Sequence, residues 1–251
     1  ERARYAYHHA KYAVADDRLL VTSENWKPGG TGGNGSRGWG IVVRDPTLAG
    51  QLAAVFHSDT GWNDSKSWAE INDSALQPDS SDNTTYPGRF DQFRTCANET
   101  TLLVAPDNAR EPIRRLLRGA NRSIWIQQVS IQRDGVLLNE TMAAARRGVE
   151  VRILLSGAWY VESENRKLAE SLRKRAEREH LPVRVRIVEP RSRFEHVHNK
   201  GVIVDHRSVL VGSLNWNEHA LGENREVVVR VDDPAVADYF ERLYEYALEH
   251  I

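Results

Sequence analysis

The chain has 251 residues, of which 40% are hydrophobic and 27% charged, an ordinary composition for a globular protein that buries one large core or two smaller ones. Its formal net charge of −1 excludes a global field that would attract a polyanion, and its single cysteine, Cys96, excludes an internal disulfide framework and a cysteine-rich metal site. No apolar run is long enough to span a bilayer, so we expect no stable membrane insertion.

The first feature along the chain is a polar stretch that precedes an apolar run. It reads His9-Ala10-Lys11-Tyr12-Ala13-Val14-Ala15-Asp16, a pattern H-x-K-x4-D, and the apolar residues 19–21 and then Ser23-Glu24-Asn25 follow it. Residues 40–43 predict a further strand, and the spacing of apolar residues from Leu48 to Phe56 predicts a helix.

Two segments near this region predict loops. Residues 28–36 are dense in glycine, and we interpret them as a flexible rim beside the polar stretch. Residues 57–100 are rich in Asp, Asn, Ser, Thr and Trp without sustained periodicity, and we interpret them as a long connection with one short helix around Ser67–Asn72.

After residue 100 the pattern alternates between strands and helices. Strands are expected at Thr101–Ala105, Ser123–Val129, Val149–Leu155 and Val183–Val188, and helices at Glu111–Arg118, Val136–Arg147 and Glu162–Glu179. Such alternation implies a largely parallel sheet with helices on its faces.

Charge is unevenly distributed along the chain. Residues 101–200 hold 20 Lys or Arg against 12 Asp or Glu, although the whole chain is nearly neutral. The excess comes mostly from Arg166–Arg178 and Arg184–Arg193, and it indicates either a solvated helix face or a surface that attracts anions.

A second polar stretch repeats the first. His198-Asn199-Lys200-Gly201-Val202-Ile203-Val204-Asp205 is again H-x-K-x4-D, and a short apolar run leads from it into Gly212-Ser213-Leu214-Asn215. Asp45-Pro46 and Asp233-Pro234 then each follow a valine-rich strand and open a helical pattern. The chain therefore contains an internal repeat of a strand–strand–strand–helix unit.

The spacing of the polar residues indicates their chemistry. Residues two apart on an extended backbone face the same way, so His198 and Lys200 share one face. If the chain turns and returns beside this strand, Asn215 arrives near them. An imidazole, an ammonium and an amide on one wall suit an anionic, tetrahedral substrate such as a phosphate ester.

The two stretches, each followed by Ser-x-Asn, resemble the duplicated signature of the phospholipase D superfamily. The match in residue type and spacing is close at His198, Lys200, Asp205, Ser213, Asn215 and Glu226, and looser at His9, Lys11, Asp16, Ser23 and Asn25. The resemblance implies an α/β fold, a pseudo-two-fold pair of phospholipase D-like lobes, each a largely parallel mixed sheet flanked by helices. Residues 1–56 would form the C-terminal half of the first lobe, 57–100 the inter-lobe connection and 101–251 the complete second lobe.

The first lobe therefore lacks the α/β half that precedes the signature in the second. We expect that half to come from a segment outside this sequence or from another chain.

The resemblance also implies a two-step mechanism without metal or other cofactor. One of His9 and His198 attacks phosphorus and forms a covalent phosphohistidine, and the other acts as general acid and then as base. Lys11, Lys200, Asn25 and Asn215 would bind the non-bridging oxygens. Asp16 and Asp205 would hold local turns, and Ser23 and Ser213 would hydrogen-bond nearby groups.

The two copies differ at one acidic position. Glu226, just before Val227-Val228-Val229, resembles the family's residue that orients a catalytic imidazole, whereas the first copy has Gly40 before Ile41-Val42-Val43. One histidine therefore lacks its usual carboxylate partner or takes one from elsewhere.

Other residues near the signatures have simpler interpretations. Trp26 and Trp216 follow the two signature asparagines at the same offset, and we expect both to pack into a core or pocket wall. The pairs His8/His9 and His196/His198 could hold a cation, but no carboxylate or cysteine ligand set accompanies them, so we expect no metal.

Three functions stay open at this point. A phosphodiesterase acting on nucleic acid is favoured over one hydrolysing or transferring phospholipid head groups, for which Ala158-Trp159-Tyr160-Val161 is the candidate membrane-facing loop. A catalytically silent anion-binding module is the third. Asn-x-Ser/Thr triplets favour a secreted or cell-surface location, because they matter only there; they begin at Asn34, Asn63, Asn72, Asn83, Asn98, Asn121 and Asn139.

Overall fold

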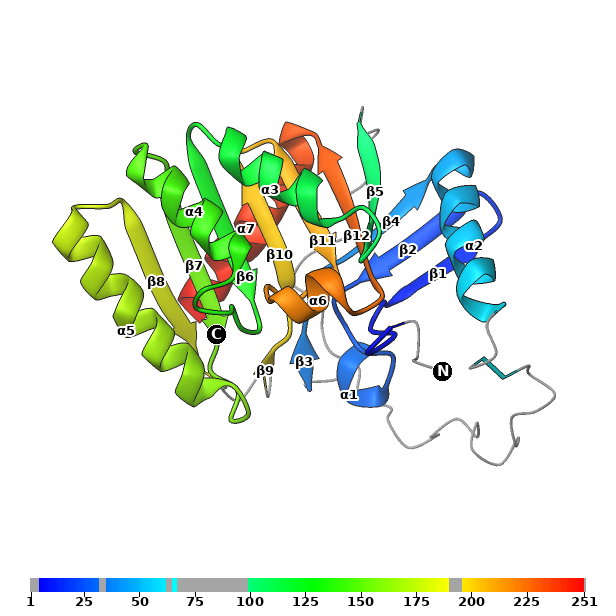
Figure 1. The fold of residues 1–251 in the computed structure, drawn as a ribbon, viewed down its shortest axis with the longest axis horizontal. Coiled ribbons are helices and arrows are strands. Elements are labelled where there is room, and N and C mark those ends of the chain that lie inside the picture. The colour runs from blue at the N-terminus through cyan, green and yellow to red at the C-terminus, as the bar shows by residue number, and fades with distance from the viewer. Residues whose placement is uncertain (1–4, 32–34, 62–64, 67–98, 190–195, 251) are drawn as a thin grey trace.

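The computed structural model describes residues 5–31, 35–61, 65–66, 99–189 and 196–250 (Figure 1). The helix expected around Ser67–Asn72 and most of the predicted connection lie outside these residues. We call the parts on either side of this connection the first lobe and the second lobe.

Seven strands of the described second lobe form one sheet, in the order β5-β12-β11-β10-β6-β7-β8. The strands are β5 (Thr100–Ala105), β6 (Ser123–Gln128), β7 (Glu150–Ser156), β8 (Val183–Val188), β10 (Lys200–Val204), β11 (Ser208–Gly212) and β12 (Glu226–Asp232). The four strands expected between residues 101 and 188 are all present, with ends that differ by one residue at most.

The sheet is mixed, as expected, but most neighbouring strands run antiparallel. Within this sheet, only β6–β7 and β7–β8 pair in parallel. Parallel neighbours need a long crossover, which helices supply between β6, β7 and β8. By contrast, the short turn Asp205–Arg207 joins β10 to β11, and strands joined so tightly must run antiparallel.

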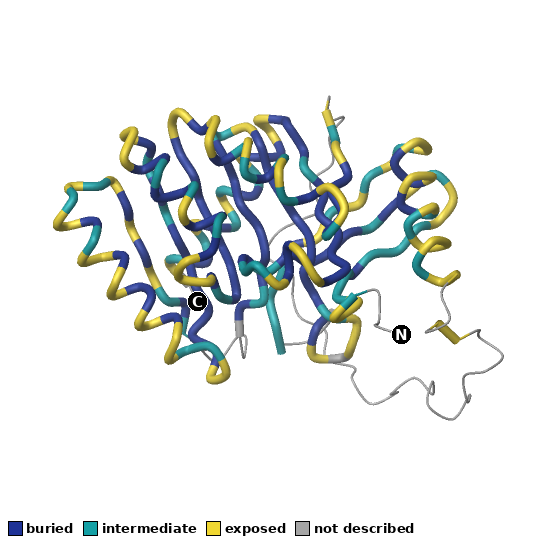
Figure 2. The backbone as a smooth tube through the Cα atoms, in the orientation of Figure 1, coloured by how far each residue is buried: buried dark blue, intermediate teal, exposed yellow. Residues whose placement is uncertain are grey.

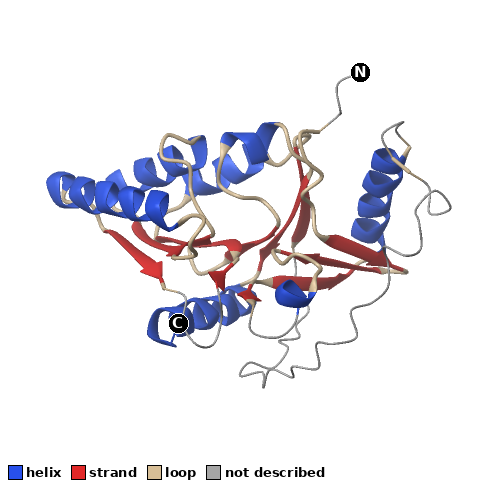
Figure 3. Ribbon diagram, turned by 90° about the horizontal axis from the view of Figure 1, so that it is seen from below, coloured by secondary structure: helices blue, strands red, loops and turns tan. Residues whose placement is uncertain are grey.

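Helices cover both faces of this sheet (Figures 1 and 3). On one face lie α3 (Arg110–Gly119), α4 (Val136–Arg146) and α5 (Glu162–Glu179), and on the other lies α7 (Pro234–His250); α6 (Glu218–Gly222) precedes β12. Side chains alternate along β10, so that Val202 and Val204 join the apolar cluster under α3 and α4 while Ile203 joins the cluster around α7. None of the described helices combines the length and apolar character needed to cross a bilayer.

The described first lobe has a smaller antiparallel sheet in the order β1-β2-β4. Its elements are β1 (Tyr12–Ala15), β2 (Arg18–Thr22), α1 (Pro28–Thr31), β3 (Ser36–Arg37), β4 (Gly40–Arg44) and α2 (Pro46–Thr60). The glycine-rich run that we interpreted as a loop thus contains a short helix, α1. Helix α2 begins after Asp45, whose carboxylate accepts the backbone N–H groups of Thr47 and Leu48, and it extends beyond residue 56.

The two lobes share one core around Trp39, which lies just before β4. Its side chain is buried, its ring centroid lies 4.8 Å from that of Phe240 on α7, and a Cβ on Gly201 of β10 would clash with the indole. Only glycine permits this close approach of β10 to the ring. The same apolar cluster joins Leu19 of β2 to Val211 of β11, and Figure 2 shows buried residues on strands of both lobes.

A buried arginine adds a polar link between the lobes. Arg225 Nε and Nη2 lie 2.8 and 2.9 Å from the two carboxylate oxygens of Asp59 on α2, and Nη1 lies 2.8 Å from Asp107. The guanidinium also donates to the Ala105 carbonyl and contacts Tyr5. Paired and hydrogen-bonded in this way, the buried charge fixes how α2 sits against β12.

Replacement of Trp39 by alanine should destabilise both lobes together. We expect Trp39→Ala to lower the free energy of unfolding by about 3–5 kcal/mol, because it leaves a cavity in the shared core. Val42→Ala, on an exposed side chain of the same strand, should change it by at most about 0.5 kcal/mol. Urea denaturation followed by circular dichroism measures both, and equal stabilities for the two variants would contradict a shared core.

Candidate active site

The signature histidines join the two lobes through reciprocal backbone hydrogen bonds. The His9 N–H donates to the Arg225 carbonyl at 3.0 Å, and the His198 N–H donates to the Arg37 carbonyl at 2.8 Å. Strand β9 (His196–Val197) accordingly pairs with β3 of the first lobe, at the lower edge of the view in Figure 1. The backbone of each histidine is therefore hydrogen-bonded to the opposite lobe.

His9 is held by a fully buried carboxylate of the second lobe. Its Nδ1 lies 2.9 Å from both carboxylate oxygens of Glu226, 217 positions away in the sequence. Ser213 Oγ and Asn224 Nδ2 donate to the same carboxylate at 2.5 and 3.1 Å. A carboxylate at Nδ1 favours the tautomer with its proton there, which leaves Nε2 with a lone pair.

His198 lies against the lysine of its own signature. Lys200 Nζ is 3.2 Å from Nδ1 and 3.1 Å from Nε2 of the His198 ring, and it also donates to the Ser23 carbonyl at 3.4 Å. In the first lobe, Lys11 Nζ donates to the His9 carbonyl at 2.5 Å. The i, i+2 spacing thus brings each lysine beside its histidine.

The two lysines and two glutamates form one electrostatic cluster. The pKa of Lys200 is lowered to about 7, mainly by burial and also by the charge of Lys11, against the raising influence of Glu24 and Glu226. Burial lowers the pKa of Lys11 to about 8, against the raising influence of Glu226 and Glu24. Because the same glutamates act on both lysines, the lysines of the two signatures belong to one cluster of charges.

The signature asparagines and serines follow β2 and β11 at equivalent places. Asn215 Oδ1 is buried without a hydrogen-bond partner among the described residues, whereas Asn25 is half-buried. Ser213 Oγ donates to Glu226, and Ser23 Oγ donates to the Trp39 carbonyl at 3.2 Å and accepts its N–H. The serines thus bond to neighbouring groups, as expected.

The signature aspartates lie at turns. Asp205 has φ 56°, and its carboxylate accepts the backbone N–H groups of residues 121–123 at 2.8–3.1 Å. Asp16 has φ 52° and is exposed at the turn between β1 and β2. Aspartate tolerates this left-handed conformation better than most residues.

The pairing of the strands changes which residue of the first copy corresponds to Glu226. Aligned on their valine-rich strands, Glu226 and Gly40 correspond, but the ladder pairs Thr22 with Gly40 and Gly212 with Val228. Gly40 is therefore the counterpart of Val228, and Gly38 is the counterpart of Glu226. The comparison of sequences missed this because a run of similar apolar residues does not fix strand register.

Sequence reasoning also missed Glu24. This glutamate is buried, and its Oε2 lies 3.7 Å from Nδ1 of His198. The available signal was its place inside Ser23-Glu24-Asn25, where the second copy has the apolar Leu214.

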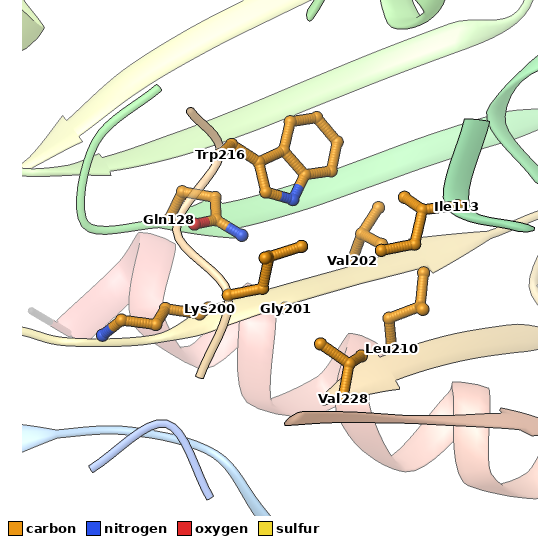
Figure 4. Close-up of a pocket in the computed structure, with 9 residues that line it drawn as sticks. Ile113, Gln128, Lys200, Gly201, Val202, Leu210, Trp216 and Val228 are labelled. Carbon is orange, nitrogen blue, oxygen red and sulfur yellow. The ribbon is translucent and has the colours of Figure 1, made fainter. Parts of the chain in front are cut away.

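Two further features of the described residues concern other kinds of site. No three His, Cys, Asp or Glu side chains gather there in a way that could hold a metal ion. A cavity beneath α3 is lined by Ile113, Gln128, Lys200, Gly201, Val202, Leu210, Leu214, Trp216 and Val228 (Figure 4). The lysine side chain extends away from the others in that view, so the cavity belongs to the apolar layer and not to the cluster of charges.

Comparison with known proteins identifies the family. Residues 113–248, more than half of the chain, match the family model described as "Cardiolipin synthase, PLD-like domain". The chain is also similar to a phospholipase D of Rickettsia prowazekii (strain Madrid E), with 26% identity over 144 residues, which cover 57% of this chain and 64% of that protein. The match thus spans less than two thirds of the length of this relative.

Solved structures share the fold. Phosphatidylserine synthase from Haemophilus influenzae Rd KW20 matches 94% of this chain with 61% of its own, at a TM-score of 0.59 and 18% identity. NucT from Helicobacter pylori matches 60% of this chain with 96% of its own, at a TM-score of 0.50 and 23% identity. At these identities the likeness concerns the fold alone. Together with the family match, it shows that this chain belongs to the phospholipase D superfamily.

Proposed function

We propose that this chain is a phosphodiesterase that works through a covalent phosphohistidine on His9. The observation that carries the proposal is the contact of His9 Nδ1 with the buried Glu226 carboxylate, within the same cluster of charges as Lys11, Lys200 and His198. Buried lysines beside a buried glutamate, together with two imidazoles, suit a reaction in which negative charge is stabilised and a proton is transferred.

In the first step, the lone pair of His9 Nε2 attacks phosphorus and forms a P–N bond, and the P–O bond to the leaving group breaks. His198, as imidazolium, gives its proton to the departing oxygen. Lys11, Lys200 and the signature amides bind the non-bridging oxygens. Glu226 holds the proton on His9 Nδ1 and stabilises the positive charge that the ring gains on attack.

In the second step, water attacks the phosphohistidine. The now neutral His198 takes a proton from the water, the P–N bond breaks, and His9 leaves with its lone pair restored. The product is a phosphate monoester, and both histidines return to their starting states. An alcohol in place of water would complete a transfer by the same steps.

For the substrate, we propose nucleic acid, supported by exposed aromatic side chains beside the site. Trp26 directly follows Asn25 and is 54% exposed, contrary to the expectation that it packs like the buried Trp216. Trp159 and Tyr160, in the loop before α5, are 87% and 45% exposed. Desolvation, with the charge of Glu24 adding to it, raises the pKa of Tyr160, so this loop borders the cluster. Exposed rings next to a phosphate site suit stacked bases.

The arginines of α5 give less support. Arg166 pairs with Glu162 and Glu189, and Arg175 and Arg178 pair with Glu179. Much of the basic excess is therefore neutralised along the helix, which fits a solvated face.

A lipid substrate is the second candidate, and the same loop favours it. An almost fully exposed tryptophan at the mouth of a site is the kind of side chain that enters a membrane interface. The relatives named phospholipase D and phosphatidylserine synthase point in this direction by their names.

Alanine variants of the two histidines should separate their roles. With bis(p-nitrophenyl) phosphate, whose leaving group needs no proton, we expect His198→Ala to keep a burst of one p-nitrophenolate and then turn over slowly. We expect His9→Ala to lose both burst and turnover, by at least about 10³-fold. Stopped-flow absorbance measures the burst, and mass spectrometry after an alkaline quench locates the phosphate.

His57→Ala, on an exposed residue of α2, is the matched control and should behave as the wild type. A burst retained in His9→Ala would refute the assignment of the nucleophile. Substrate binding without any covalent phosphate would favour the silent anion-binding module instead.

Anion binding should weaken as the pH rises. Both lysines have lowered pKa values, so each is charged below its pKa, about 7 for Lys200 and about 8 for Lys11, and loses its charge as the pH rises through that value. We expect the Kd for tungstate, a tetrahedral dianion, to increase by about tenfold or more between about pH 6 and about pH 9. Calorimetric titration across this range measures it.

Lysine variants test the cause of this dependence. Lys200→Met should remove the part of the decline nearest pH 7, whereas Lys174→Met, on an exposed residue of α5, should leave it intact. An unchanged profile in both Lys200→Met and Lys11→Met would show that other groups carry the dependence.

The exposed tryptophan should distinguish the substrates. We expect Trp26→Ala to lower kcat/KM for a single-stranded oligonucleotide by about fivefold to 100-fold, the loss of one stacked base. Phe56→Ala, an exposed aromatic residue on α2, should have no effect. If cleavage of phospholipid vesicles falls in Trp26→Ala and Trp159→Ala while oligonucleotide cleavage stays constant or is undetectable, the lipid candidate replaces this one.

A further inference from the structure

Glu24 and Gly38 occupy places in the first lobe that a single glutamate fills in the second. The Ser213 N–H donates to the Val227 carbonyl at 3.0 Å, and the Ser23 N–H donates to the Trp39 carbonyl at 2.9 Å. With the reciprocal bonds of the two histidines to Arg225 and Arg37, these bonds give one correspondence of residues. Glu226, between Arg225 and Val227, corresponds to Gly38, between Arg37 and Trp39.

The carboxylate of Glu24 lies where a side chain at position 38 would begin. A Cβ built on Gly38 would come well within 3.0 Å of Glu24 Oε1, of the Glu24 carboxyl carbon and of Ser23 Oγ. Glycine at 38 therefore leaves the space that Glu24 fills. In the second lobe the corresponding arrangement is reversed, with Glu226 on the strand and Leu214 after the serine.

The partners of the two carboxylates correspond as well. Glu226 accepts a hydrogen bond from Asn224, two residues before it, and Glu24 accepts one from Ser36, two residues before Gly38. Each carboxylate then faces a histidine of the other lobe's signature, His9 for Glu226 and His198 for Glu24.

We propose that Glu24 is the positioning residue of His198 and takes the role that Glu226 has for His9. The first lobe has thus kept a carboxylate for the opposite imidazole but supplies it from the turn after β2 and not from the strand. The kinetic consequences of this proposal rest on the proposed function, whereas the orientation of the His198 ring does not.

The two carboxylates do not hold their histidines equally. Glu226 lies 2.9 Å from His9 and has hydrogen bonds to both oxygens, whereas Glu24 lies 3.7 Å from His198, and its Oε1 is buried without a hydrogen-bond partner among the described residues. The ammonium of Lys200 also contacts the His198 ring. Glu24 is therefore the more distant of the two carboxylate partners, which suits a histidine that gives and takes a proton.

The alternative role for Glu24 is to balance the charges of Lys11 and Lys200. Both roles place a carboxylate near the lysines, but they differ in what its loss does. A counter-charge alone predicts tighter anion binding and an unchanged kcat when Glu24 is neutralised. A positioning residue predicts a lower kcat and a His198 ring that no longer holds one tautomer.

The test uses Glu24→Gln, with Glu170→Gln on the exposed face of α5 as the control. We expect kcat on bis(p-nitrophenyl) phosphate to fall by about 10-fold to 100-fold with KM little changed, by analogy with other outer-shell partners of histidine. Nitrogen NMR of the imidazoles, recorded at a pH high enough for His198 to be neutral, should show its proton mainly on Nδ1 in the wild type and a mixture of tautomers in Glu24→Gln. The control should match the wild type in both measurements.

A double variant tests whether the location of the carboxylate in space matters more than which residue supplies it. Glu24→Leu with Gly38→Glu recreates the arrangement of the second lobe, and we expect it to recover both kcat and the wild-type tautomer, which Glu24→Leu alone should lose. Circular dichroism and the melting temperature establish that each variant is folded. Recovery would not follow if Glu24 served only to stabilise the local fold.

Two results would overturn the inference. One is an unchanged His198 tautomer in folded Glu24→Gln, and the other is an unchanged kcat with tighter tungstate binding. If the wild type cleaves no phosphodiester but the tautomer still changes as expected, the proposed function fails while the positioning role of Glu24 stands.

Discussion

The buried carboxylate of Glu226 is the constraint on which the rest of the site depends. A charge with no exposure to water is tolerated only when hydrogen bonds and an opposite charge surround it. Ser213, Asn224 and His9 hydrogen-bond to this carboxylate, and the ammonium of Lys11 interacts with it electrostatically. His9 comes from the other lobe, so satisfying this carboxylate also docks the lobes. The same contact fixes the ring of the proposed nucleophile, and fold and chemistry therefore share one interaction.

The lysines show how docking changes the chemistry of ordinary residues. Each lysine alone would be a fully charged surface group, but burial of both in one cluster lowers the pKa of each into the neutral range. An arriving phosphate restores the charge that burial disfavours. Asn215 Oδ1 and Glu24 Oε1, which have no hydrogen-bond partner among the described residues, belong to the same neighbourhood, where burying such atoms costs stability.

The correspondence of Glu24 with Glu226 indicates how a repeated fold retains a function while its sequence changes. The backbone positions are the same in both lobes, but the carboxylate has a different origin. Such an exchange is possible because a short turn after β2 and the start of the next strand converge on one point in space. The glycine at 38 is then a consequence of crowding, not of an unusual backbone angle.

The sequence by itself determined most strands and helices of the second lobe, because periodicity and short spacings are local properties. From the same spacings it predicted the repeat and the histidines, lysines and asparagines of the candidate site. Only the tertiary structure decided that most strands run antiparallel, that Trp26 is exposed while Trp216 is buried, and which carboxylate faces which imidazole. These depend on strand register and on contacts between residues as far apart as His9 and Glu226. The sequence comparison therefore matched Glu226 with Gly40, although Gly38 is its counterpart in the structure. Hydrogen bonds between strands, and not similarity along one strand, set which residues correspond.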